Sequence, residues 1–228
     1  MLHGFLPTLL DGTLTTLGVA GASLVIAVLL GLVGAAAKLS RIPVIRWLAS
    51  TYTTVVRGVP DLVLMLLIFF GGQIGINAAA AALGYEGYVD INPFVAGVAT
   101  IGFIFGAYLT ETFRGALMAI PAGQREAGLA FGMSPMRVFL RITFPQMVRL
   151  AIPGFTNNWL VLVKSTAIVS VIGLTDMMHS AGLAAGATRE PFTFYLAAAA
   201  IYLAITSISL LALGALEKRV TVGLRGAA

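Results

Sequence analysis

The sequence has very few charged residues for its length. Only 10% of its 228 residues are Asp, Glu, Lys or Arg, whereas a soluble domain carries roughly 25%. Hydrophobic residues make up 59% of the chain, and the mean hydropathy is +0.98. So few charges cannot cover a water-exposed surface of this size. We therefore expect lipid to cover much of the molecule.

Cysteine is absent, and histidine is limited to His3 and His179. The missing cysteine excludes disulfides and thiolate metal sites, and it leaves the redox compartment open. With so few histidines, we predict neither a metal nor a cofactor on this chain. No Lys or Arg precedes the first apolar run, which argues against a cleaved signal peptide.

Five apolar segments approach or exceed the roughly 20 residues that cross a bilayer. They predict an all-α membrane protein with one transmembrane domain, residues 1–228, and no internal repeat. The stretch 42–57 is amphipathic and too charged to span, so we expect it either to lie at the interface or to extend the second span. The predicted spans are about 13–37, 60–83, 93–117, 152–174 and 192–216.

The basic residues predict the orientation of these spans. With the N-terminus outside and the C-terminus inside, only Arg189 falls outside and only Lys164 lies within a span. The positive-inside rule favours this orientation. The net charge of +5 is scattered between apolar runs, so we expect no nucleic-acid partner. The other basic residues then lie inside: Lys38, Arg41, Arg46, Arg57, Arg114, Arg125, Arg137, Arg141, Arg149, Lys218, Arg219 and Arg225.

The long inside loop, about residues 121–145, predicts two short helices with a turn at Gly132. Ser134 is a favourable N-cap residue, and Pro135 suits the first position of the helix that follows. Met136, Phe139, Leu140 and Phe144 then recur at helical spacing. This pattern indicates a compact knob on the cytoplasmic face.

The same loop resembles the signature of permease subunits of bacterial ATP-binding-cassette importers. That signature is Glu-Ala-Ala, three residues, Gly, nine residues, Ile-x-Leu-Pro, and the chain matches it at Glu126, Ala127, Gly132, Ile142 and Pro145. It departs at Gly128, where Ala is usual, and at Phe144, where Leu is usual. The resemblance implies a type I importer permease fold in the bacterial inner membrane. It also implies that Glu126, Ala127, Gly128, Gly132 and Ser134 belong to a coupling helix that docks on the ATPase. A loop that merely caps the bundle is the alternative.

The likeness extends over the whole chain. The segments Arg57–Asp61, Thr110–Gly115 and Asn157–Trp159 are similar to the polar amino-acid branch, in particular to Q-type permeases of histidine/lysine/arginine/ornithine importers. Opine permeases are similar too. The resemblance implies partners: a paralogous permease, two copies of an ATPase that binds ATP and Mg, and a periplasmic amino-acid-binding protein, which we expect on the outer loops 84–92 and 175–191. The chain has no phosphate-binding loop, because no glycine stands at the required positions before Lys164. We predict a transport subunit without catalytic residues.

Three ionisable residues within or at the ends of spans are candidates for the cargo pathway: Asp61, Glu111 and Lys164. Such residues are costly in lipid and usually face protein or a cavity. The carboxylates could attract a cationic cargo, and Lys164 could meet the cargo's carboxylate. Alternatively, Lys164 pairs with one of the carboxylates, or Glu111 pairs with Arg114 three residues on.

Asn157 and Asn158 follow Pro153-Gly154, which can loosen the fourth span. They are further candidates for the pathway, and hydrogen bonding between helices is the alternative. In the third span, Gly102 and Gly106 favour close packing against another helix. A different class, a stand-alone secondary transporter or channel, stays open, although such transporters are often built from repeats that this chain lacks.

Overall fold

The computed structural model describes residues 4–220, which are almost entirely helical. A π-helical turn, η1 (Phe139–Thr143), and a 3-10 turn, η2 (Thr166–Ile172), flank α7. The α-helices are α1 (Leu6–Lys38), α2 (Pro43–Gly58), α3 (Asp61–Ala82), α4 (Pro93–Met118), α5 (Ala122–Ala130), α6 (Pro135–Val138), α7 (Phe144–Ser165), α8 (Met177–Thr188) and α9 (Pro191–Val220).

Five stretches are long and apolar enough to cross a membrane, which confirms the predicted number within the described residues. They are α1, α3, α4, the run Pro135–Ile172 and α9. The first begins at Leu6, earlier than predicted, because an apolar turn precedes Asp11 and continues the helix.

The fourth stretch differs most from the prediction, which placed its start near residue 152. The second helix of the inside loop is not separate from it, since α6 continues through η1 into α7. Pro145 has no N–H to donate to the carbonyl of Arg141, and it would normally interrupt a helix. The wider π-helical turn over Phe139–Thr143 lies immediately before it and relaxes the backbone there.

The core lies between α1 and α4, which make the most extensive contact in the chain. Gly106 of α4 permits this approach, because a Cβ there would lie 2.8 Å from the Cβ of Leu30. At Gly102, an added Cβ would lie 2.7 Å from Ile26, so both glycines serve the close packing that the sequence favoured. Phe105 and Leu109 are buried in the same core.

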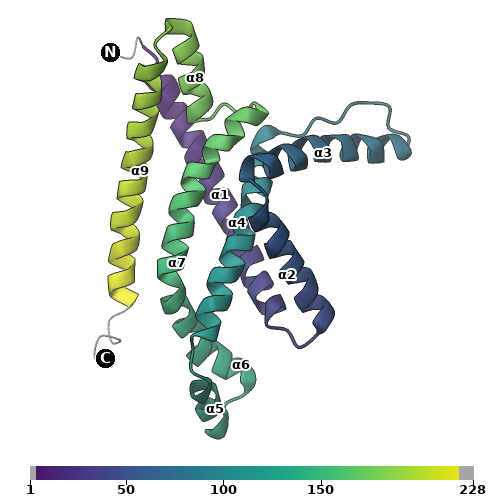
Figure 1. Ribbon diagram of the computed structural model, residues 1–228, viewed down its shortest axis with the longest axis vertical. Helices are drawn as coiled ribbons and strands as arrows, with labels where there is room; N and C mark the ends of the chain where they lie inside the picture. Colours follow the sequence, from purple (N-terminus) through teal and green to yellow (C-terminus); the bar gives the residue numbers. More distant parts are fainter. Residues whose placement is uncertain (1–3, 221–228) are drawn as a thin grey trace.

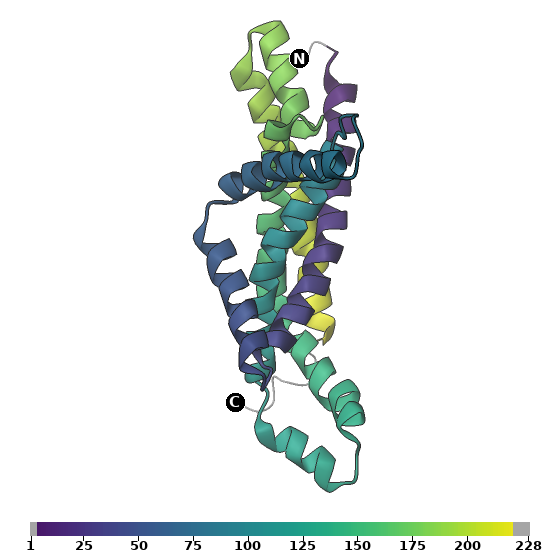
Figure 2. The ribbon, with the colours of Figure 1, turned by 90° about the vertical axis from the view of Figure 1, so that its right-hand side faces the viewer.

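The remaining long helices differ in direction. As Figures 1 and 2 show, α7 and α9 run along the long axis of the molecule with α1 and α4, whereas α3 runs across it. The α2 helix packs beside α1 and α4, and the Tyr52 hydroxyl donates to the Phe103 carbonyl at 2.6 Å. It ends at Gly58, and extended backbone at Val59 separates it from α3, so α2 does not simply lengthen the second span.

The two ends of the bundle carry different elements. Figure 1 shows α5 and α6 projecting beyond one end, while the start of α1, α8 and the start of α9 lie at the other. The segment 175–191, expected as an outer loop, contains α8. This helix packs through Ala181 and Ala184 against Leu9 of α1 and Phe194 of α9.

Candidate functional site

The coupling knob (residues 121–145) is built by local backbone chemistry. The α5 helix ends at Ala130, and Gly132 takes a positive φ of 79°, which favours glycine. The side chain of Ser134 then caps α6 by accepting from the Arg137 N–H at 3.4 Å, and Pro135 occupies the first turn. The predicted turn and cap are therefore present.

Gly128 is the one buried residue of α5. An added Cβ there would lie 2.8 Å from the Cδ1 of Ile142 and 3.0 Å from the Cγ2 of Val138. The missing side chain lets α5 pack directly against the α6–η1 segment. Glycine at this position, where alanine is usual, thus allows the close contact that holds α5 against the start of the fourth span.

The outer surface of the knob is apolar at its tip. Phe131 is 89% exposed and Met136 is 65% exposed, and Glu126 and Ala127 of α5 are exposed beside them. Such side chains at the end of a membrane bundle suit contact with another protein. The knob is joined without a break to the fourth membrane-spanning stretch, because α6 runs on through η1 into α7.

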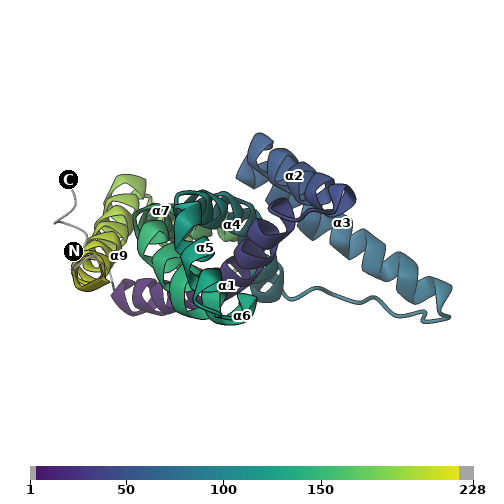
Figure 3. The same ribbon diagram turned by 90° about the horizontal axis from the view of Figure 1, so that it is seen from below.

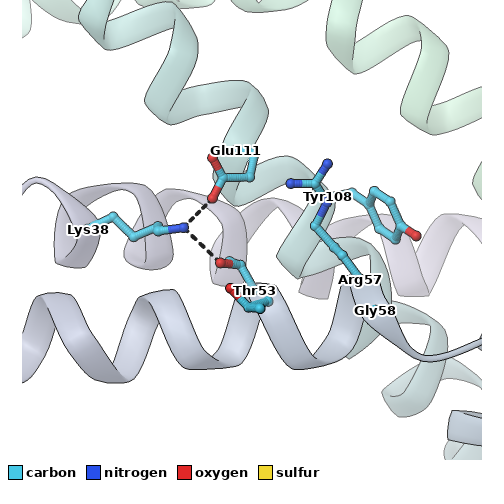
Figure 4. Close-up of a pocket in the computed structure, with 7 residues that line it drawn as sticks. Lys38, Thr53, Arg57, Gly58, Tyr108 and Glu111 are labelled. Atoms are coloured by element: carbon cyan, nitrogen blue, oxygen red, sulfur yellow. Dashed lines mark hydrogen bonds and ion pairs between the residues drawn. The ribbon is translucent and has the colours of Figure 1, made fainter.

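A second feature is a polar cavity of about 460 Å³ between α1, α2 and α4 (Figure 4). The Lys38 ammonium donates to the Glu111 carboxylate and to the Thr53 hydroxyl, the latter at 2.8 Å. Arg114 Nη2 lies 2.8 Å from the other Glu111 oxygen. The predicted Glu111–Arg114 pair is present, but the Lys38 contact was not foreseen. The Glu111 carboxylate therefore forms ion pairs with two cationic side chains.

Arg57 adds a further positive charge to this cavity. Its guanidinium lies over the Tyr108 ring, 5.3 Å from the ring centroid, which is the geometry of a cation–π contact. Lys38 and Arg57 thus line the same cavity as Glu111, and Lys38 and Arg114 both pair with its carboxylate. This local excess of positive charge does not suit the attraction of a cationic cargo to Glu111.

Asp61 lies apart from Glu111, at the start of α3. It is half-buried, and its carboxylate lies within hydrogen-bonding reach of the Ser165 hydroxyl at the end of α7. Within residues 4–220, neither Lys164 nor any other cation forms an ion pair with it. Among residues 4–220, Asp61 is therefore the predicted pathway carboxylate that forms no ion pair.

The two asparagines of α7 have different surroundings. Asn158 donates to the Thr112 hydroxyl of α4 at 2.8 Å and to the Gly154 carbonyl at 2.9 Å. An added Cβ at Gly154 would lie 2.8 Å from the Cγ2 of Thr112, so the two helices touch at this point. Asn158 thus holds α7 to α4, as the packing alternative proposed, whereas Asn157 is exposed.

Lys164 is exposed and faces a mainly apolar groove of about 520 Å³. The groove lies between the α7–η2 junction, α8 and α9, and Tyr195 and Tyr202 line it. The structure thus does not gather the predicted pathway residues into one site. Glu111 lines the α1–α2–α4 cavity, Asp61 contacts the α7 end, and Lys164 faces α9.

At the opposite end from the knob, Asp176 is fully buried. Its Oδ1 caps α8 by accepting from the His179 N–H at 2.9 Å, while Oδ2 has no hydrogen-bond partner among the described atoms. Burial raises the pKa of the Asp176 carboxyl above its ordinary value, and the hydrogen bond from His179 offsets only part of this effect. Sequence reasoning missed this residue, because nothing in the sequence signals that α8 folds back onto α1.

Comparison with known proteins is consistent with this arrangement. The family described as "Binding-protein-dependent transport system inner membrane component" matches residues 23–222. The chain is 51% identical over 227 residues to the histidine/lysine/arginine/ornithine transport system permease protein HisQ of Escherichia coli (strain K12), a match that covers 100% of this chain and 99% of HisQ. It is 43% identical over 201 residues to the octopine transport system permease protein OccQ of Rhizobium radiobacter, covering 88% of this chain and 85% of OccQ.

Two solved structures resemble the fold. A chain of an amino acid ABC transporter crystallised with histidines is 33% identical, with a TM-score of 0.79 over 93% of this chain and 94% of that chain. A chain of the inward-facing MetNI methionine ABC transporter is 16% identical, with a TM-score of 0.70 over 95% of this chain and 96% of that chain. The second likeness concerns the fold alone.

Proposed function

The chain belongs to the family of binding-protein-dependent transport system inner membrane components, and on that premise we propose that it conducts basic amino acids. It is the inner-membrane permease subunit of an amino-acid ATP-binding-cassette importer, a transport component rather than an enzyme. The observation that supports a basic cargo is the 51% identity to HisQ over the full chain. Its proposed cargo is histidine, lysine, arginine and ornithine.

The proposed complex contains this chain, a paralogous permease and two copies of an ATPase, which bind ATP and Mg. A periplasmic binding protein delivers the cargo to the end of the bundle that carries α8. In this proposal the N-terminus lies outside and the coupling knob lies inside. The excess of basic residues near the knob supports this orientation.

The proposed mechanism is alternating access. Closure of the ATPase pair displaces α5, and the continuity of α6, η1 and α7 passes this movement to the fourth span. The turn at Gly132 and the packing at Gly128 make the knob a rigid lever, because together they hold the C-terminal end of α5 against the α6–η1 segment. Glu126, Ala127 and Ser134 are the proposed contacts at its exposed surface.

For the cargo pathway we propose Asp61 as the residue that attracts the cationic side chain. Asn157 and Lys164 are exposed and remain proposed contacts for the cargo, with Lys164 suited to its carboxylate. Glu111 and Asn158 act through the helix contacts described above. The Asp61→Asn variant should therefore weaken arginine uptake at unchanged assembly, with Asp11→Asn as the control, since Asp11 is an exposed carboxylate of α1. Unchanged uptake kinetics in Asp61→Asn would remove Asp61 from the pathway.

The cargo is tested with proteoliposomes that contain the whole complex. Radiolabelled arginine and histidine should accumulate, and excess lysine should compete with them. Octopine uptake without arginine uptake would favour the opine alternative, to which the 43% identity with OccQ also points. Arginine uptake by this chain alone, driven by a proton gradient, would identify a secondary transporter instead.

A further inference from the structure

The polar cavity between α1, α2 and α4 holds more positive charge than its ion pairs use. Both oxygens of Glu111 are already paired, one with Lys38 and the other with Arg114. Arg57 lines the same cavity, and within residues 4–220 no carboxylate forms an ion pair with it. Three cationic side chains and one carboxylate leave an excess of positive charge. The cavity therefore suits an anion.

Hydrogen-bond donors also remain free at this cavity. An ammonium group has three N–H donors, and Lys38 uses two of them, toward Glu111 and Thr53. The Arg57 guanidinium lies over the Tyr108 ring and donates no hydrogen bond within the described residues. Figure 4 shows Lys38 and Arg57 on either side of Glu111. A free guanidinium fork beside an ammonium is the combination that binds phosphate oxygens.

The cavity lies in the half of the bundle that carries the coupling knob. Lys38 is the last residue of α1, and Glu111 lies about two turns before the end of α4, which leads directly to α5. The α1 helix has 33 residues, more than the roughly 20 that cross the hydrocarbon core, so its last turn reaches the level of the lipid headgroups. Basic pockets between membrane helices at this level bind anionic headgroups.

The outer face of α2, beside the cavity, suits acyl chains. Figure 3 shows α2 at the periphery of the bundle, on the side of α4 away from α9. Val44, Leu48 and Val55 are each more than half exposed, and their helical spacing places them in one stripe. Trp47 is exposed next to this stripe, and tryptophan is typical of the membrane interface. A basic cavity beside an apolar stripe matches the two parts of a phospholipid, whereas a free phosphate ion would use the cavity alone.

We propose that the α1–α2–α4 cavity binds the phosphate group of an anionic phospholipid, from the leaflet that surrounds the knob end of the bundle. The phosphate oxygens accept from the Arg57 guanidinium and from the free N–H of Lys38, and the acyl chains lie along the apolar stripe of α2. The cavity volume of about 460 Å³ is within the roughly 300–1,000 Å³ of small-ligand sites, so the neighbouring headgroup atoms fit as well. A zwitterionic lipid suits the site less, because its own cationic group is repelled by the excess positive charge.

Native mass spectrometry of the whole complex, delipidated in detergent and then titrated with phosphatidylglycerol or phosphatidylcholine, tests this site. The wild type should bind phosphatidylglycerol more tightly than phosphatidylcholine. Arg57→Gln should weaken phosphatidylglycerol binding by about tenfold or more, because a charged hydrogen bond is lost. Arg46→Gln is the matched control, since it removes the same charge from α2 but does not line the cavity, and it should leave the affinity nearly unchanged. Equal losses in the two variants would indicate general surface attraction and overturn the proposal.

Two further measurements cover the other outcomes. If inorganic phosphate binds the lipid-free complex in an Arg57-dependent way while phosphatidylglycerol binding ignores Arg57→Gln, the site takes a free anion and the lipid proposal is wrong. Should Arg57→Gln fail to assemble, Thr54→Val removes only a hydroxyl from the cavity wall and should weaken phosphatidylglycerol binding by about two- to tenfold. Thr51→Val, on the exposed part of α2 outside the cavity, is its control. Phosphatidylglycerol binding that is the same in Thr54→Val and Thr51→Val would contradict the proposal.

Discussion

Lys38 and Glu111 form an ion pair that joins the end of α1 to α4, and their side chains are only 14% and 19% exposed. The same carboxylate binds Arg114, so Glu111 is shared between a local partner and a distant one. The main role of Glu111 in the cavity is therefore to hold α1 and α4 together. This changes what a substitution of Glu111 should do.

We predict that Lys38→Met destabilises the subunit by about 1–3 kcal/mol, because it removes a charged hydrogen-bond donor from a poorly solvated carboxylate. The measurement is chemical or thermal unfolding of the purified complex in detergent. Arg114→Leu is the matched control, since Lys38 still satisfies Glu111 there and Arg114 is more exposed, so a smaller loss is expected. Equal stability of Lys38→Met and wild type would show that the pair contributes nothing.

A second prediction concerns Gly132, which forms the turn of the coupling knob. The Gly132→Val variant places a β-branched residue at a φ of 79°, which costs about 1–3 kcal/mol locally and should move the turn. We expect an assembled complex in which ATP hydrolysis no longer drives uptake. Gly123→Ala in α5 is the control, because an added Cβ there meets nothing within 4 Å. Normal transport by Gly132→Val would remove this turn from the coupling mechanism.

Two substitutions of Gly128, with side chains of increasing size, test the packing of α5. Gly128→Ala brings a methyl group within 2.8 Å of the Cδ1 of Ile142 and 3.0 Å of the Cγ2 of Val138, and it should lower stability by about 1–3 kcal/mol while transport continues. Gly128→Leu cannot be accommodated in this way and should separate α5 from the fourth span. The ratio of cargo imported to ATP hydrolysed measures the difference. The same ratio in both variants would mean that this contact transmits no force.

The sequence predicted the features that depend on neighbouring residues. Apolar run lengths predicted five spans, and the order Gly132, Ser134, Pro135 predicted a turn followed by a capped helix. Long-range contacts could not be predicted in this way. Lys38 and Glu111 are 73 residues apart, and no local pattern joins them. The continuity of α6 with α7 was missed because Pro145 normally ends a helix, and the π-helical turn that accommodates it has no sequence signal of its own.

The buried carboxyl of Asp176 predicts a pH effect. Because its folded-state pKa is raised, the folded protein holds a proton that the unfolded chain loses, so this group's contribution to stability falls as pH rises above its unfolded value. Asp176→Asn keeps an oxygen to cap α8 and removes the titration. As the pH rises above about 4, the ordinary range of an aspartate pKa, the variant should gain stability relative to wild type.

The comparison with Asp176→Asn cancels the titration of the groups that the two proteins share. Asp176→Ala serves as the control for the cap, and it should be less stable than Asp176→Asn at every pH, by about 0.5–2 kcal/mol. A difference between wild type and Asp176→Asn that stays constant with pH would contradict a raised pKa at this site.

The account depends most on the claim that this chain is the permease of an ATP-driven importer for basic amino acids. The direct measurement is the rate of ATP hydrolysis by the reconstituted complex with empty and with arginine-loaded binding protein. We predict that arginine-loaded binding protein raises the rate and that arginine enters the vesicles only when ATP is present. A rate unaffected by the loaded binding protein, or arginine uptake that continues without ATP, would contradict the account.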